Sequence, residues 1–418
     1  MSTDLPERVD VFLDAVELMP RRRIGSLRKV GRRPNAPVSF AYDPDWVQDP
    51  AFFLIDPSHQ PYSGEQIPPD GGLAGIFTDT SPDRWGRMLL ERREAEQAAT
   101  EGRRPRALGE WEFLLGVNDH LRMGALRFAV ADDAPFLDAG PSSVPPAAEL
   151  RELEAAAREI EHPSNGRGRP DLRAAIALLL APGSPLGGAR PKTTFRLDDG
   201  ALWLAKFPSR NDRRDVGAWE FVLNELARRA GIEVPETRLL RLGGTYHTFS
   251  ARRFDRVGED RRLFASAMTM IGRRDRELSS YIEIAEAISV NGAPGRIGTD
   301  LAQLFRREVF NVLVGHRDDH LRNHGFLRHP EGWRLAPAYD LNPVPDLAGH
   351  ELAIGIDSHA PSVDLALEEA APFCRLKPSQ AELIVGEVRS ALAGWQDLAM
   401  NLGLPDHEID LIGSAFAP

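Results

Sequence analysis

The sequence predicts an α+β protein, with an α/β amino-terminal part and a mainly α-helical carboxyl-terminal part. Up to Asp255, short apolar runs bounded by turn residues alternate with segments of helical periodicity. Beyond Asp255, the apolar residues recur almost wholly at helical spacing. A stretch rich in Pro, Ala and acidic residues at 131–148 marks a boundary between regions. We therefore expect an α/β subdomain at 1–145, a second region at 146–255 and a helical lobe at 256–418.

The first notable element is a basic segment in which seven Lys or Arg lie between Arg21 and Arg33. Ile24, Leu27 and Val30 interrupt the charges, and the segment PVSFAYDPDWV follows, which is the pattern of two strands joined by a charged turn. A charged hairpin at the edge of a sheet is the more common structure for such a segment. A contact surface for a partner or for DNA is the alternative.

Further helices and strands are expected in order along the chain. Ser81 and Pro82 are an N-cap residue and a first-turn proline, so they predict that a helix begins there. The later elements are helices at 147–162 and 171–181, a strand at 201–207, a helix from Val216 that ends before Gly231, and a hairpin whose turn is Gly243-Gly244.

The composition excludes several classes of function. Lys and Arg number 51 against 62 Asp and Glu, and the net charge of −11 argues against nucleic-acid binding through the whole surface. The single cysteine, Cys374, excludes a disulfide framework, a thiolate zinc site and an iron–sulfur cluster. No apolar run approaches the roughly 20 residues of a membrane helix, and the amino terminus lacks the pattern of a secretory signal. We therefore expect a cytoplasmic protein.

The densest cluster of reactive side chains lies at 311–327, directly after an apolar helix. His316-Arg317-Asp318, with Asn323 five residues after the aspartate, fits the H-R-D-x-x-x-x-N pattern of a protein-kinase catalytic loop. In that chemistry the aspartate orients the attacking hydroxyl group, and the asparagine oxygen binds Mg²⁺ without adding charge. Asp319, the next residue, is expected to point away from the substrate. A polar surface loop is the alternative for a pattern this short.

Three further residues fit the same chemistry. Asp340 lies 22 residues beyond Asp318, where a kinase places its second metal-binding carboxylate. Lys206 lies in an apolar strand, where an ammonium group is costly unless an anion such as a nucleotide phosphate meets it. Glu220, on the following helix, is placed to hold Lys206 in an ion pair. The alternatives are a lysine whose ammonium reaches solvent and a solvated helix charge.

A Gly-rich segment, Gly187-Gly188-Ala189-Arg190-Pro191-Lys192, precedes the strand of Lys206. It departs from the Walker A loop, because Pro191 has no backbone N–H and stands directly before Lys192. The kinase G-x-G-x-x-G pattern is also absent from it. A flexible turn that carries Arg190 and Lys192 is compatible with gripping phosphates, and a plain tight turn is the alternative.

These segments together resemble the HipA family, the serine/threonine kinase toxins of bacterial toxin–antitoxin modules. The resemblance covers about residues 180–350 and is carried by SPLGGARPKTTF, LAKFP, AGIEVPE, RRFDR, NVLVGHRDDHLRNHGFL and LAPAYDLNP. It implies a protein-kinase-like two-lobed fold, in which 146–255 is the ATP-binding region. It further implies that Asp318 is the catalytic carboxylate, that Asn323 and Asp340 hold Mg²⁺, and that Lys206 binds the ATP phosphates. His316 is given no catalytic role, since the family does not require His-Arg before the aspartate.

The resemblance also implies cofactors, substrates and partners. ATP and Mg²⁺ would be used to phosphorylate a Ser or Thr of a cellular protein, with an aminoacyl-tRNA synthetase as one candidate. A small helix-turn-helix antitoxin of the HipB type would carry the acidic chain to DNA. Autophosphorylation near the Gly-rich segment would regulate the kinase, and Ser184, Thr193 and Thr194 are the candidate positions.

Two other classes of function fit parts of the sequence. A catalytically inactive kinase-like binding module is one, although such a scaffold would not need the Lys, Asp, Asn and Asp set. A metal-dependent hydrolase is the other, with His316, His320 and His324 spaced by four and Asp318 and Asp319 between them. That spacing aligns the three imidazoles only on a continuous helix, and glycines bracket the segment.

Overall fold

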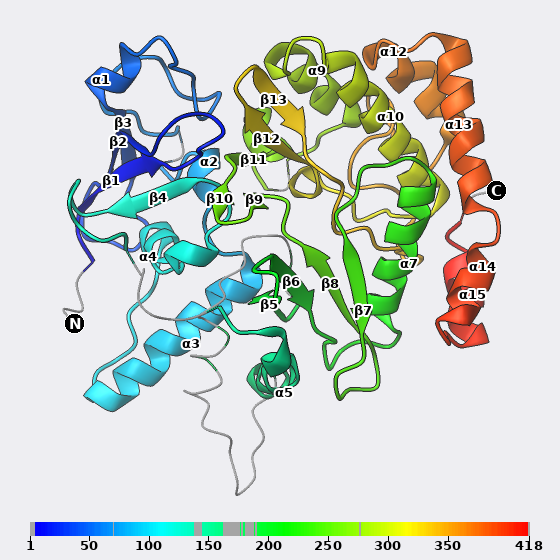
Figure 1. The fold of residues 1–418 in the computed structure, drawn as a ribbon, viewed down its shortest axis with the longest axis horizontal. Coiled ribbons are helices and arrows are strands. Elements are labelled where there is room, and N and C mark those ends of the chain that lie inside the picture. The colour runs from blue at the N-terminus through cyan, green and yellow to red at the C-terminus, as the bar shows by residue number, and fades with distance from the viewer. Residues whose placement is uncertain are drawn as a thin grey trace, which may run out of the picture. The chain divides into compact units, whose positions relative to one another are not determined.

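The structure, a computed structural model, describes residues 5–69, 71–137, 144–161, 176, 179, 188, 190–275 and 277–416. The chain forms two compact units, and Figure 1 labels most of their helices and strands. Unit 1 comprises Met1–Arg210 with Asp255–Ala265, and unit 2 comprises Asn211–Phe254 with Ser266–Pro418. The predicted α+β class is confirmed. The predicted middle region is divided, because its first strands belong to unit 1 and its helix and last hairpin to unit 2.

Unit 1 contains an antiparallel sheet with the strand order β3-β2-β1-β4. Its strands are β1 (Arg8–Leu13), β2 (Arg22–Lys29), β3 (Val38–Tyr42) and β4 (Leu126–Ala129). The other elements are α1 (Pro44–Val47), α2 (Gly75–Thr78), α3 (Arg84–Glu101), α4 (Glu110–Leu115), η1 (Asp119–Leu121), η2 (Ala147–Glu149), α5 (Leu150–Glu161), β5 (Lys192–Arg196), β6 (Leu202–Lys206), β9 (Arg256–Val257) and β10 (Asp260–Arg261). Strand β11 (Phe264–Ser266) crosses the boundary to unit 2.

The basic segment forms β2, which pairs with β3 in an antiparallel hairpin. Because β3 is the outer strand of the sheet, the expected hairpin at the sheet edge is confirmed, although β2 itself lies between β1 and β3. An inner strand can carry these charges because acidic side chains from other segments neutralise them. The ion pairs are Arg23 with Asp43 at 2.6 Å, Arg28 with Glu65 at 2.6 Å and Lys29 with Glu112 at 2.7 Å.

The helix predicted near Ser81 is α3, and it begins after Asp83. The Asp83 carboxylate accepts a hydrogen bond from the Gly86 N–H at 2.8 Å, which is the N-cap contact that the sequence assigned to Ser81. Ser81 instead donates to the Phe77 carbonyl oxygen at 2.9 Å. The helix predicted at 147–162 is α5, and the helix predicted at 171–181 lies outside the described residues apart from Ile176 and Leu179.

Unit 2 is mainly helical, as predicted. Its elements are α7 (Val216–Arg229), β7 (Thr237–Leu240), β8 (Thr248–Arg252), α8 (Ala267–Met270), α9 (Tyr281–Asn291), α10 (Ile297–Leu313), η3 (Leu321–Asn323), β12 (Gly325–His329), β13 (Gly332–Leu335), α11 (Val363–Leu365), the π-helical turn η4 (Ala366–Ala370), α12 (Ala371–Phe373), α13 (Pro378–Leu392), α14 (Trp395–Asn401) and α15 (Asp406–Gly413). In Figure 1, α13 and α14 run beside α7, and α13 also contacts α10.

The carboxyl-terminal helix α15 is anchored to the start of α7. Trp219 donates its indole N–H to the Glu408 carboxylate at 2.9 Å, and the Asp215 N–H donates to the same carboxylate at 3.1 Å. Glu408 is buried, and a carboxylate is favourable at the amino-terminal end of a helix. No helix in the part of the chain that the structure describes is long and apolar enough to cross a membrane.

Candidate active site

The loop after α10 carries the predicted catalytic residues. The inner face of α10 is packed through five side chains that are at most 1% exposed: Leu301, Leu304, Phe305, Val309 and Leu313. The loop therefore leaves a rigid scaffold. Gly315 turns the chain with a φ of 64°, and a Cβ atom there would lie 2.6 Å from the Ala415 carbonyl oxygen, so this position requires glycine.

Hydrogen bonds join this loop to the segment that carries Asp340. The Val344 N–H donates to the Gly315 carbonyl oxygen at 2.9 Å. The Tyr339 hydroxyl group donates to the Arg322 carbonyl oxygen at 2.5 Å. The two segments that hold the predicted catalytic and metal-binding residues are therefore joined within unit 2.

Within the loop, Asp318 is exposed and Asn323 is buried. The Asp318 side chain is exposed and makes no hydrogen bond or ion pair with the described residues. Asn323 is 5% exposed, and its side-chain N–H donates to the Asp318 carbonyl oxygen at 3.3 Å. The other side-chain atom, Asn323 Oδ1, is buried without a hydrogen-bond partner among the described residues. An unpaired buried amide oxygen is costly, and it is a hard oxygen ligand of the kind that Mg²⁺ prefers.

Asp340 has a strained backbone. Its φ is 61°, in the left-handed region that residues other than glycine rarely adopt. Its Oδ1 accepts a hydrogen bond from the Asn342 side-chain amide at 3.2 Å. Such strain persists only where the surroundings hold it, and it is common at functional sites. The half-buried Asp340 carboxylate and the unpaired Asn323 oxygen fit the ligand set expected for Mg²⁺.

Asp319 points into unit 2, as expected, and is 1% exposed. Its Oδ2 accepts hydrogen bonds from the Tyr281 hydroxyl group, from the Asn311 amide at 3.0 Å and from His324 Nε2 at 2.8 Å. Burial by itself would raise the pKa of Asp319, but the imidazoles of His324 and His316 hold it well below the ordinary value. The loop is therefore anchored from inside by an ionised carboxylate.

His316 lies between Asp319 and the Asp340 segment. Its Nε2 is 3.6 Å from Asp319 Oδ1, and its Nδ1 is 2.8 Å from the Asn342 carbonyl oxygen. Burial by itself would lower the pKa of His316, but the Asp319 carboxylate raises it above the ordinary value. Its role in the site was not predicted from the sequence.

The geometry does not support the metal-dependent hydrolase. His316 and His324 both face Asp319, but the segment is not a continuous helix: it is a loop with the short turn η3. No group of three His, Cys, Asp or Glu residues among those the structure describes is arranged to hold a metal ion.

The two lysines predicted to bind phosphate lie directly opposite each other in unit 1, Lys206 on β6 and Lys192 on β5. Both are buried. The Lys192 ammonium is 2.7 Å from Asp83 Oδ2, in a side chain that is 1% exposed. Opposing lysines repel each other across a strand pair, and Asp83 offsets that repulsion. Lys206 is 7% exposed, and its strand β6 is an inner strand of its sheet.

The other predicted residues are placed less completely. Glu220, on α7 in unit 2, is 2% exposed, so it is not a solvated helix charge. Gly188 is exposed with a φ of 93°, and Arg190 is half-buried. Thr193 and Thr194 are 0% exposed in β5, so their hydroxyl groups are not accessible to phosphorylation in this conformation. Gly187, Ala189 and the candidate Ser184 lie outside the described residues.

Sequence reasoning missed Tyr281 and Asn311 as partners of the loop, and Asn342 as the partner of Asp340. Tyr281 and Asn311 lie on α9 and α10, whose residues read as ordinary helix positions. The only sequence signal was the short distance between Asn342 and Asp340, two residues apart in YDLN.

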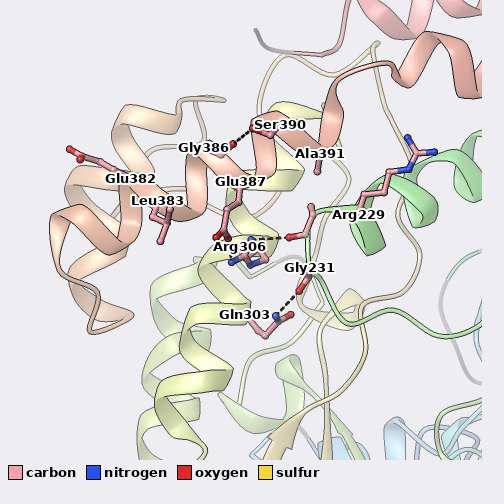
Figure 2. Close-up of a pocket in the computed structure, with 11 residues that line it drawn as sticks. Arg229, Gly231, Gln303, Arg306, Glu382, Leu383, Gly386, Glu387, Ser390 and Ala391 are labelled. Atoms are coloured by element: carbon pink, nitrogen blue, oxygen red, sulfur yellow. Dashed lines mark hydrogen bonds and ion pairs between the residues drawn. The ribbon is translucent and has the colours of Figure 1, made fainter.

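A separate open groove of about 870 Å³ lies in unit 2 between the end of α7, α10 and α13. Figure 2 shows Arg306 of α10 next to Glu387 of α13. Arg306 donates to the Glu387 carboxylate at 2.5 Å and to the Ala230 carbonyl oxygen at 2.8 Å. Gln303 donates to the Gly231 carbonyl oxygen at 2.8 Å. These contacts satisfy carbonyl groups at the end of α7. None of the predicted site residues lines this groove.

The sequence of this chain is similar to those of known proteins. Residues 184–395, half of the chain, match the model of the HipA-like C-terminal domain. Over 237 residues the chain is 26% identical to the protein named Putative kinase Y4dM of Sinorhizobium fredii. That match covers 51% of this chain and 56% of the relative, so the chain spans little more than half the length of the curated protein it matches.

A solved structure matches over a longer range. The chain is similar to HipA in the complex of the Shewanella oneidensis MR-1 toxin–antitoxin system with HipB and its operator DNA. The TM-score is 0.66 at 16% identity, and the match covers 97% of this chain and 94% of that one. The likeness confirms the expected kinase-like, two-lobed fold. Since the family model spans half of its length and includes every predicted site residue, the chain belongs to the HipA-like family.

Proposed function

We propose that this chain is an ATP- and Mg²⁺-dependent serine/threonine protein kinase of the HipA type. The observation that carries the proposal is that one loop holds both an exposed Asp318 carboxylate and a buried Asn323 oxygen without a hydrogen-bond partner among the described residues. A hydrogen bond from Tyr339 joins this loop to the segment of Asp340. Family membership supports the same activity, as does the name of the relative Y4dM.

Asp318 would act at the nucleophile. Its carboxylate accepts a hydrogen bond from a Ser or Thr hydroxyl group of the substrate and orients the oxygen toward the γ-phosphorus of ATP. As the new O–P bond forms, the bond between the γ-phosphorus and the bridging oxygen breaks, ADP leaves, and the hydroxyl proton passes to Asp318. Because the reaction needs mainly positioning, a carboxylate on a rigid loop is the central requirement.

Asn323 and Asp340 would hold Mg²⁺, which neutralises charge on the ATP phosphates when bound. The Asn323 amide contributes an oxygen without charge, and the Asp340 carboxylate contributes one with charge. Lys206 would bind the phosphates, since a buried ammonium group is favourable next to an anion. We propose Glu220 as the residue that holds Lys206, and Arg190 and Lys192 of the Gly-rich segment as further residues that bind the phosphates.

Partners and substrate follow from the family. The likeness to HipA in a complex with HipB and operator DNA supports a small helix-turn-helix antitoxin as the partner. DNA would be reached through that partner, because this chain has a net charge of −11. The substrate would be a cellular protein with an accessible Ser or Thr, and an aminoacyl-tRNA synthetase is one candidate.

The test is transfer of label from γ-labelled ATP to a protein in a cell extract, with and without Mg²⁺. The proposal expects a labelled protein with phosphoserine or phosphothreonine, identified by mass spectrometry. Asn323→Ala and Asp340→Ala should abolish the Mg²⁺ dependence of ATP binding in calorimetry. ATP binding without transfer to any protein would instead identify an inactive kinase-like binding module.

A further inference from the structure

His316 contacts two separate parts of the candidate site. It is 1% exposed, and its Nδ1 lies 2.8 Å from the Asn342 carbonyl oxygen. The Asn342 N–H also lies 3.3 Å from the same Nδ1, so this nitrogen faces both backbone groups of Asn342 and can donate to the carbonyl oxygen or accept from the N–H. His316 Nε2 lies 3.6 Å from Asp319 Oδ1, an electrostatic contact longer than a hydrogen bond. One imidazole therefore joins the anchored catalytic loop to the Asp340 segment.

The contact continues from Asn342 to the predicted metal ligand. The Asn342 side-chain amide donates to Asp340 Oδ1 at 3.2 Å. The φ of 61° at Asp340 is strained, and such a conformation depends on the contacts around it. The His316 bond holds the backbone of Asn342, two residues away. An unbroken series of contacts thus runs from Asp319 through His316 and Asn342 to Asp340.

We infer that His316 is a positioning residue, which sets the Asp340 carboxylate relative to Asp318 by holding the Asn342 backbone. The inference rests on the proposed function, because Asp340 matters as a ligand of Mg²⁺. Partners that orient metal ligands typically change metal affinity by 10- to 100-fold. A histidine that only filled the core would change the stability of unit 2 and leave metal affinity as it is.

The experiment measures Mn²⁺ binding to the full chain by electron paramagnetic resonance, with a non-hydrolysable ATP analogue present. His316→Phe, which keeps the ring volume without a donor, should weaken Mn²⁺ binding about tenfold or more. His316→Asn places an amide N–H near the position of Nδ1 and should restore most of the affinity. Asn291→Leu is the control, because the Asn291 amide donates to the Ala287 carbonyl oxygen within α9, at 3.3 Å, and is no part of the series of contacts from Asp319 to Asp340. Its Mn²⁺ affinity should equal that of the wild type.

A double-mutant cycle tests the route through Asn342. Asn342→Ala should weaken Mn²⁺ binding, and adding it to His316→Phe should cause little further loss, since both changes break one series of contacts. If the losses of Mn²⁺ affinity in the two single variants multiplied in the double variant, His316 would not act through Asn342. A folded His316→Phe chain with wild-type Mn²⁺ affinity would likewise overturn the positioning role, while the proposed kinase function would stand. Failure of the wild-type chain to bind Mn²⁺ with the analogue would overturn the proposed function, and this inference with it.

Discussion

Asp318 and Asp319 are neighbours in the chain and lie in opposite environments. Asp318 is exposed, whereas Asp319 is 1% exposed and accepts hydrogen bonds from Asn311 and His324. The two carboxylates therefore have different roles. Asp318 can meet a substrate hydroxyl group, and Asp319 holds the loop that presents it.

Asp318→Asn should reduce phosphoryl transfer by about 10²- to 10⁴-fold, because the amide keeps the shape but cannot take the proton. ATP affinity should stay unchanged, since Asp318 holds neither the phosphates nor the metal. Transfer is measured with labelled ATP and affinity by calorimetry. Asp410→Asn, an exposed carboxylate on α15, is the control. Wild-type transfer by Asp318→Asn would remove the residue from the reaction.

Asp319→Asn should act on stability. The amide leaves the imidazoles of His316 and His324 without their buried anion, and breaking a buried ion pair costs about 3–5 kcal/mol. The free energy of unfolding, measured with urea, should fall by an amount in that range. Asp318→Asn is the matched control, with an expected change within about 0.5 kcal/mol because it is exposed. Equal stability of the two variants would contradict the anchoring role of Asp319.

Replacing Lys206 should change ATP binding, whereas replacing Lys192, which lies opposite it, should change thermal stability. Lys206→Met should weaken ATP binding at least about tenfold, because it removes the charge proposed to meet the phosphates. Lys192→Met should instead lower the melting temperature, because it leaves Asp83 buried without its cation. Calorimetry and thermal unfolding separate the two effects. A Lys206→Met chain with wild-type ATP affinity would exclude Lys206 from the site.

The ionised Glu94 carboxylate should stabilise unit 1 at neutral pH, and this stabilisation should be lost in acid. Hydrogen bonds from Arg103 and Arg106 lower the pKa of Glu94 from 4.5 to about 2. A carboxyl group with a lower pKa in the folded state stabilises the fold above its unfolded pKa, and that contribution disappears as the pH falls from about 4.5 to 2. Glu94→Gln should therefore melt below the wild type at neutral pH, and the difference should shrink across that range. Glu91→Gln, exposed on the same helix, is the control for thermal unfolding, and an equal pH dependence of both variants would contradict the prediction.

The isolated chain should bind duplex DNA poorly at physiological salt. Its net charge is −11, and basic residues of β2 such as Arg23 and Lys29 are already paired with acids. A mobility-shift assay of the chain alone, and of the chain with a HipB-type antitoxin, checks this. Tight binding without a partner would make the segment from Arg21 to Arg33 a DNA-binding site.

Much of the local structure could be predicted from the sequence, because it depends on residues close together in the chain. The apolar spacing of α10 predicted a helix whose inner face is buried. The order of Asp318, Asn323 and Asp340 identified the family that the comparison then showed. The position of α3 was predicted, but not its cap, because Ser81 and Asp83 are both good caps and only the fold decides between them.

The sequence by itself determined the class of fold, the family and the residue types of the candidate site. Only the tertiary structure decided how those residues are held. Asp319 draws on Tyr281, which lies 38 residues away, and Lys192 pairs with Asp83 from a distant helix start. The basic segment became an inner strand because acids from elsewhere in the chain neutralise it. Charge pairing and burial depend on contacts between distant segments, so no local pattern can reveal them.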